Sequence, residues 1–141
     1  MGQKLLLDLK LAVIRVFDLT GKELHVFRRG TTTTKIYSLA FSPNSTHLAC
    51  CSGSGTVHIF DLNCDPDQTK NVKSILYGYK SILPGYFSSE WSCQKHYINS
   101  ATKMVCEFDD NGALHVATLD GKYYKIFGDD YSSINEEDLF A

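Results

Sequence analysis

A repeated strand motif, spaced by about the length of one propeller blade, is the feature that most constrains this fold. The heptapeptide VIRVFDL at 13–19 recurs as TVHIFDL at 56–62, which places Phe17 and Phe60 43 residues apart. A four-stranded blade of a WD-type propeller takes about 40–45 residues. The spacing therefore predicts two copies of one structural unit.

A third copy of the unit follows at a different spacing. Residues 39–60 resemble residues 106–127, so that Phe41 and Phe108 are 67 residues apart, as are Phe60 and Phe127. The same unit thus recurs with about two dozen additional residues, which must lie between Asn63 and Asn99.

Within each unit, short runs of β-branched and aromatic residues alternate with turn formers. In the second unit we expect strands at 36–41, 47–51 and 56–60, separated by Ser-Pro-Asn-Ser and Gly-Ser-Gly. The third unit shows the same pattern, and no helix-period segment of useful length occurs before residue 130. The sequence predicts an all-β fold of WD40-like β-propeller blades.

The three units predict one partial β-propeller over residues 1–141. We expect the end of one blade at about 1–30, a second blade with a long inserted loop at 31–100, a third at 101–128, and a solvated, mobile acidic tail at 129–141. Propellers close with 4–8 blades, so three blades would leave unpaired sheet edges. A fragment, a truncated gene model, or a protomer that completes its ring with other chains would each account for this.

Composition and motifs exclude several classes of function. The net charge of −2 argues against a protein held to nucleic acid by counterion release. The five cysteines form no CxxC pair and no zinc-ligand spacing with histidine, which indicates reduced thiols, no metal and no cofactor. No nucleophile elbow, zinc-protease or phosphate-loop motif is present, so we expect no enzyme. No targeting or membrane-spanning segment is evident.

The segment FRRGTTTTKIYSLAFSPNSTHLACCSGSGTVHIFDL, residues 27–62, resembles the PROPPINs, seven-bladed β-propellers that bind phosphoinositides and act in autophagy. Residues 80–92 resemble the long membrane-facing loop of their sixth blade, and 120–127 the closing part of the seventh. The resemblance covers about residues 13–130 and implies three of seven blades, the fifth to the seventh. It also implies a cytoplasmic protein that associates peripherally with autophagic, endosomal or vacuolar membranes, binds PtdIns3P or PtdIns(3,5)P2, and meets other autophagy proteins.

The adjacent Arg28 and Arg29 pose a geometric question. In a β-strand successive side chains leave opposite faces, so the two guanidinium groups cannot serve one pocket. The resemblance implies two lipid pockets and assigns to the second Arg29, Gly30, Ser52, Thr56 and His58. Thr56 and His58 share one strand face, and Ser52 lies across the glycine turn, so these donors suit phosphate oxygens.

The first pocket would take Arg15 and Arg28. The hydroxyl residues that the family carries before this arginine strand are absent from residues 6–12, where Asp8 would repel phosphate. We therefore expect this pocket to be degenerate, unless the first dozen residues come from a wrong start site.

The inserted segment adds a second membrane feature. Between Lys70 and Trp91, apolar and aromatic residues lie beside lysines, a combination that suits the lipid headgroup boundary. Part of it could pair as strand, which leaves 81–87 as the exposed tip. The residues expected to enter the bilayer are Ile82, Leu83, Tyr86 and Phe87.

Less specific interpretations remain open at this point. Adjacent arginines at a strand end are commonly solvated charges that protect a sheet edge, and His58 could belong to an ordinary structural network. The rival function is a WD-repeat scaffold for protein–protein interaction without lipid specificity. A third possibility is that the short chain does not fold usefully by itself.

Overall fold

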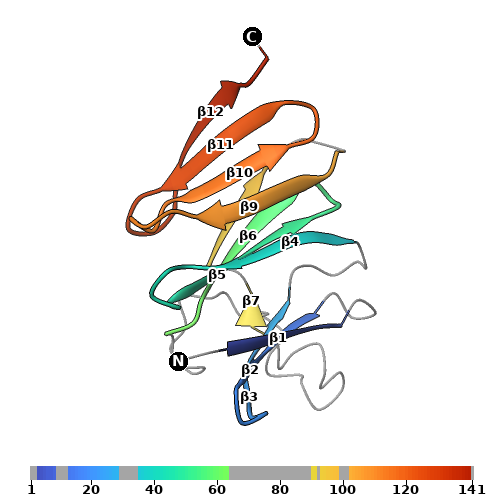
Figure 1. The fold of residues 1–141 in the computed structure, drawn as a ribbon, viewed down its shortest axis with the longest axis vertical. Coiled ribbons are helices and arrows are strands. Elements are labelled where there is room, and N and C mark those ends of the chain that lie inside the picture. Colours follow the sequence, from blue (N-terminus) through green and yellow to red (C-terminus); the bar gives the residue numbers. More distant parts are fainter. Residues whose placement is uncertain are drawn as a thin grey trace. The chain divides into compact units, whose positions relative to one another are not determined.

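The structure is a computed structural model that describes residues 3–8, 13–28, 35–63, 90–91, 93–98 and 102–140, with the backbone alone at 3–8, 28, 90 and 91. Every regular element in these ranges is a β-strand, and the strands form three sheets of four (Figure 1). The all-β prediction is confirmed. The chain divides into two compact units, Met1–Thr33 with Cys64–Cys93, and Thr34–Asn63 with Gln94–Ala141.

The first unit contains one sheet, in the order β1-β2-β3-β7. Its strands are β1 (Gln3–Asp8), β2 (Val13–Asp18), β3 (Glu23–Arg28) and the short β7 (Glu90–Trp91). The first three pair antiparallel, whereas β7 joins β3 in parallel. The predicted repeat is seen here, because VIRVFD forms β2 as TVHIFD forms β6 in the second unit.

The second unit contains two sheets. One has the order β4-β5-β6-β8, with β4 (Ile36–Phe41), β5 (His47–Ser52), β6 (Thr56–Asp61) and β8 (Gln94–Tyr97). The other is a meander of β9 (Met104–Phe108), β10 (Leu114–Thr118), β11 (Lys122–Phe127) and β12 (Ser133–Asp138). We call them the β4–β8 sheet and the β9–β12 sheet.

These two sheets pack through the first strand of each, β4 and β9, which lie side by side (Figure 1). Strand β9 alternates buried and exposed residues, and Met104, Cys106 and Phe108 point into the interface. The Ser38 hydroxyl on β4 accepts a bond from the Cys106 amide at 3.1 Å and lies 3.6 Å from the Cys106 thiol. Burial of apolar side chains, at roughly 25 cal/mol per Å², holds the sheets together.

The residues expected to form a mobile acidic tail instead form the fourth strand of their sheet. All six residues of β12 pair with β11. The Lys122 ammonium lies 3.1 Å from the Asp138 carboxylate and 3.8 Å from that of Glu136, so a cation on β11 offsets part of the strand's negative charge. The prediction of a mobile end was therefore wrong, and the third unit extends past 128.

The spacing of the repeat also needs a correction. Leu48 pairs with Phe60, and Leu114 pairs with Ile126, so the counterpart of Phe60 is Ile126 and not Phe127. Phe41 and Phe108 do correspond. The one-residue offset arises in the turn, because the Ser42 amide bonds the carbonyl of His47, five residues on, whereas the Asp109 amide bonds that of Ala113, four residues on.

Candidate functional site

The turn between β5 and β6 brings the predicted hydroxyl residues together. Gly55 has φ +81°, a left-handed conformation that glycine adopts without steric cost, and its amide bonds the Ser52 carbonyl at 3.1 Å. The chain reverses tightly here, so that Ser52 at the end of β5 faces Thr56 at the start of β6. A residue with a Cβ at position 55 would oppose this reversal.

Three side chains from these strands form a buried hydrogen-bonded chain. The Ser52 and Thr56 hydroxyl oxygens are 2.9 Å apart, and the Thr56 oxygen is 3.1 Å from Nε2 of His58. All three residues are at least 95% buried. His58 stacks on Phe60, with ring centroids 6.2 Å apart, which fixes the plane of the imidazole. The structure therefore unites Ser52, Thr56 and His58, as the sequence predicted.

Ser54 is a member of this cluster that the sequence analysis missed. Its hydroxyl oxygen lies 2.8 Å from those of both Ser52 and Thr56. Its place between the glycines of Ser-Gly-Ser-Gly-Thr was the available signal, since a turn of this kind returns the side chain toward both strands. The cluster is thus three hydroxyls and one imidazole.

These residues lie on the face of the β4–β8 sheet that points away from the β9–β12 sheet. His47 contacts the Tyr131 ring of the β9–β12 sheet, and the free thiols of Cys51 and Cys106 are hydrogen-bonded to each other. Side chains alternate along a strand, so Ser52 faces the opposite way from Cys51. Cross-strand partners share a face, and His58, opposite Cys50, lies on the side of Ser52.

The remaining predicted lipid ligands are only partly described. Arg29 and Gly30 of the second pocket lie outside the described residues, as do Ile82, Leu83, Tyr86 and Phe87 of the expected membrane loop. The backbone of Arg28 ends β3 opposite Val13. The opposite-face arrangement of Arg28 and Arg29 stays a prediction.

Arg15, expected in the first pocket, is engaged elsewhere in the same sheet. Its Nη1 lies 3.0 Å from Oε2 of Glu23 across the β2–β3 pair. Both side chains are a third or more exposed, so this ion pair contributes little stability. A carboxylate beside Arg15 would compete with a bound phosphate, and the degenerate first pocket stays a prediction.

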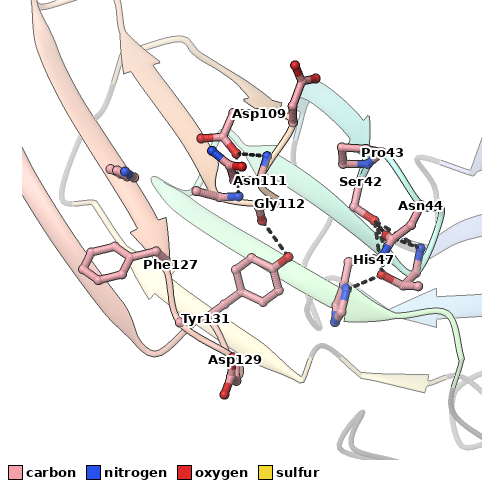
Figure 2. Close-up of a pocket in the computed structure, with 15 residues that line it drawn as sticks. Ser42, Pro43, Asn44, His47, Asp109, Asn111, Gly112, Phe127, Asp129 and Tyr131 are labelled. Carbon is pink, nitrogen blue, oxygen red and sulfur yellow. Dashed lines mark hydrogen bonds between the residues drawn. The ribbon is translucent and has the colours of Figure 1, made fainter.

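A second candidate site lies between the β4–β8 and β9–β12 sheets, at the opposite end of β5 from the hydroxyl cluster (Figure 2). It is an open cleft of about 550 Å³, which we call the inter-sheet cleft. Three turns line it, β4–β5, β9–β10 and β11–β12, with side chains that include Ser42, Asn44, His47, Asp109, Asp110, Asn111, Lys125, Phe127, Asp129 and Tyr131.

Tyr131 links the walls of this cleft. Its hydroxyl donates to the Gly112 carbonyl at 2.8 Å, as Figure 2 shows, and its own carbonyl lies 2.7 Å from Nε2 of His96 on β8. Tyr131 has φ +57°, an uncommon conformation for a residue with a side chain. Contacts to both sheets hold the β11–β12 turn in place.

Asp109 organises the β9–β10 turn at the cleft. Its Oδ1 accepts bonds from the amides of Asn111 and Ala113, each at 2.9 Å, and its Oδ2 lies 2.7 Å from Nε2 of His115. These bonds lower the pKa of the Asp109 carboxyl below its ordinary value, and the bond to His115 has the largest effect. Asp109 therefore stays charged at neutral pH.

Within the described part of the chain, no group of three His, Cys, Asp or Glu side chains is arranged to hold a metal ion. The same residues contain no helix with the length and hydrophobicity needed to cross a bilayer.

Comparison with known proteins identifies the repeat and several relatives of part of the chain. The WD domain, G-beta repeat family matches residues 21–61. Autophagy-related protein 18 of Meyerozyma guilliermondii is 54% identical over 54 residues, covering 38% of this chain and 10% of the relative. That of Vanderwaltozyma polyspora is 54% identical over 79 residues, covering 55% of this chain and 14% of the relative. Over part of its length the chain is therefore similar to PROPPIN proteins.

Solved structures support the fold of this protein over nearly its whole length. Kluyveromyces lactis Hsv2 matches with a TM-score of 0.67 and 19% identity, covering 97% of the present chain and 44% of Hsv2. A structure titled "Kluyveromyces lactis Hsv2 complete loop 6CD" matches with a TM-score of 0.66 and 21% identity, covering 97% and 45%. The predicted β-propeller blades are confirmed. The chain spans less than half of these structures, the share expected of about three blades in seven.

Proposed function

We propose that this chain is part of a PROPPIN and acts as a phosphoinositide-binding module, which recruits its protein to membranes carrying PtdIns3P or PtdIns(3,5)P2 in autophagy or endolysosomal trafficking. The observation that supports this most is the buried chain of Ser52, Thr56 and His58. It lies within residues 27–62, the segment that resembles the PROPPINs and that also carries the Arg-Arg-Gly sequence.

The chemistry of the cluster suits a phosphate group. Serine and threonine hydroxyls both donate and accept, and neutral imidazole offers one donor and one acceptor, so the cluster can rotate its donors toward an anion. In the proposed complex Arg29 supplies the main charge through a bidentate contact, and the hydroxyls orient the inositol phosphate. Binding is recognition without turnover.

The connection between β6 and β8 supplies the proposed second attachment. The third and fourth strands of the β4–β8 sheet are joined by residues 62–93, which include Ile82, Leu83, Tyr86 and Phe87. A related structure is titled "KlHsv2 with loop 6CD replaced by a Gly-Ser linker", which shows that a loop of this name was singled out in that protein. Apolar insertion and headgroup binding together give the two attachments that stable recruitment needs.

Other autophagy proteins are the proposed protein partners, and the proposed location is cytoplasmic and peripheral to membranes. Another neighbour is titled "Complex of KlAtg21 with coiled-coil of AgAtg16", so a protein of the same fold binds a coiled coil. The alternative function is a WD-repeat scaffold without lipid specificity. A pull-down with and without phosphoinositide liposomes distinguishes the two functions, because a scaffold without lipid specificity would not bind the liposomes.

Replacing Thr56 with valine tests the hydroxyl cluster. Valine keeps the β-branched shape and strand preference but removes the hydroxyl between Ser52 and His58. We expect binding to PtdIns3P liposomes, measured by flotation, to weaken about 5- to 20-fold, in line with one or two lost hydrogen bonds.

Thr118→Val is the matched control. Thr118 occupies the same turn in the β9–β12 sheet as Ser52 does in the β4–β8 sheet, and its hydroxyl accepts from the Lys122 amide at 3.0 Å. Binding of this variant should equal that of the original protein. Equal losses in the two variants would indicate a stability effect, and unchanged binding of Thr56→Val would refute the role of the cluster.

A further inference from the structure

The inter-sheet cleft has a chemistry different from that of the proposed lipid site. It lies at the His47 end of β5, whereas the hydroxyl cluster lies at the Ser52 end. At about 3.3 Å per residue, the two ends of this strand are about 17 Å apart. A ligand in the cleft would therefore not contact the hydroxyl cluster.

The cleft is preformed rather than made of loose loops. Ser42 Oγ accepts from the amides of Thr46 and His47 at 3.1 and 2.9 Å, which closes the β4–β5 turn. The β9–β10 turn is closed by Asp109, and the β11–β12 turn is held by Tyr131. A partner would not have to order these walls, so little conformational entropy would be lost on binding.

The charges that line the cleft favour a ligand of positive charge. Asp109, Asp110 and Asp129 line it with one ammonium group, that of Lys125. The carboxylates of Asp110 and Asp129 are exposed, and no hydrogen bond or ion pair among the described residues engages them. An anionic lipid headgroup would be repelled here, whereas a cation would find two available carboxylates.

The aromatic side chains provide a second feature that favours a cation. The Lys125 ammonium already lies 6.0 Å from the centroid of the Phe127 ring, so this ring attracts positive charge. Tyr131 is 92% buried and forms part of the lining beside His47. Carboxylates at an opening that also contains aromatic rings match the chemistry of arginine and lysine side chains, which pair through charge and stack through their planar or aliphatic parts.

We propose that the inter-sheet cleft docks a basic, extended segment of a protein partner, whose cationic side chains pair with Asp110 and Asp129. Its volume of about 550 Å³ exceeds that of one side chain and accommodates a short stretch of peptide. Lys125 acts as an internal competitor, because its ammonium occupies the Phe127 ring that the incoming cation would use. This inference does not depend on the proposed lipid binding.

Because Lys125 competes with the incoming cation, its removal should raise the affinity for a basic peptide. The probe is a fluorescein-labelled peptide of alternating glycine and arginine, and its glutamate counterpart is the reference. Fluorescence anisotropy should show that Lys125→Met binds the arginine peptide about two- to fivefold more tightly, and that Asp110→Asn with Asp129→Asn binds it about fivefold more weakly or worse. The glutamate peptide should not bind.

Charge-matched variants outside the cleft distinguish docking from general attraction. Lys103→Met removes a lysine at the far end of β9, whose carbonyl bonds the Leu119 amide. Glu136→Gln with Glu137→Gln removes two exposed carboxylates of β12. Both controls should bind the arginine peptide like the original protein, with unchanged circular dichroism. Changes in the controls as large as those in the cleft variants, or equal binding of the glutamate peptide, would overturn the proposal.

Discussion

Replacing Arg28 and Arg29 together with threonine is expected to abolish flotation of this protein with PtdIns3P liposomes. In the proposed complex, Arg29 provides the main positive charge of the phosphoinositide pocket, and the neutral donors cannot replace its bidentate guanidinium contact. Losing the two charged hydrogen bonds of this contact, at about 1.5–3 kcal/mol each, would lower affinity by about a hundredfold or more.

The matched control removes two lysines near the same segment. Lys22 and Lys35 are exposed, and Lys22→Thr with Lys35→Thr changes the net charge by the same amount. This control should retain most of its binding, because diffuse surface charge contributes modestly at physiological salt. Should the double arginine variant still float with the liposomes, the lipid mechanism would be wrong.

Phe60→Ala is expected to give the largest loss of stability. The Phe60 side chain is fully buried, pairs with Leu48 across β5 and stacks on His58. Truncation of a buried phenylalanine removes apolar contacts and leaves a cavity, which costs about 3–5 kcal/mol. That is a large part of the 5–15 kcal/mol by which domains are usually stable.

Phe140→Ala serves as the control for this prediction, since Phe140 is 82% exposed. Urea unfolding followed by circular dichroism should show a clear fall in midpoint for Phe60→Ala and a change within about 0.5 kcal/mol for Phe140→Ala. Similar midpoints for Phe60→Ala and the original protein would contradict the packing described for the β4–β8 sheet.

The sequence predicted the strands well where short apolar runs end at turn formers. The expected strands at 36–41 and 56–60 agree with β4 and β6 to within one residue. The hydroxyl cluster was also predictable, because a glycine turn between paired strands brings Ser52 and Thr56 together. Local turn chemistry and side-chain alternation are enough for such a site.

The missed features depend on contacts that a linear pattern does not contain. Strand β12 reads as Ser-Ile-Asn-Glu-Glu-Asp, without the apolar alternation of a strand, and it forms by pairing with β11 and through the Lys122 ion pairs. The inter-sheet cleft is built from three turns, and the β4–β5 turn precedes the other two by about 65 to 90 residues, so that only the packing of β4 on β9 brings it to them. The pairing of Arg15 with Glu23 likewise follows from the register of β2 and β3.

The most direct test of the proposed lipid site is an amide NMR titration of the chain with a soluble, short-chain PtdIns3P. The account predicts saturable shifts at Ser52, Ser54, Thr56 and His58, with little change at Asp110 or Asp129 in the inter-sheet cleft. Short-chain phosphatidylinositol, which lacks the 3-phosphate, should leave the resonances of these amides unshifted. Shifts that are absent from residues 52–58, or that appear in equal size without the 3-phosphate, would contradict it.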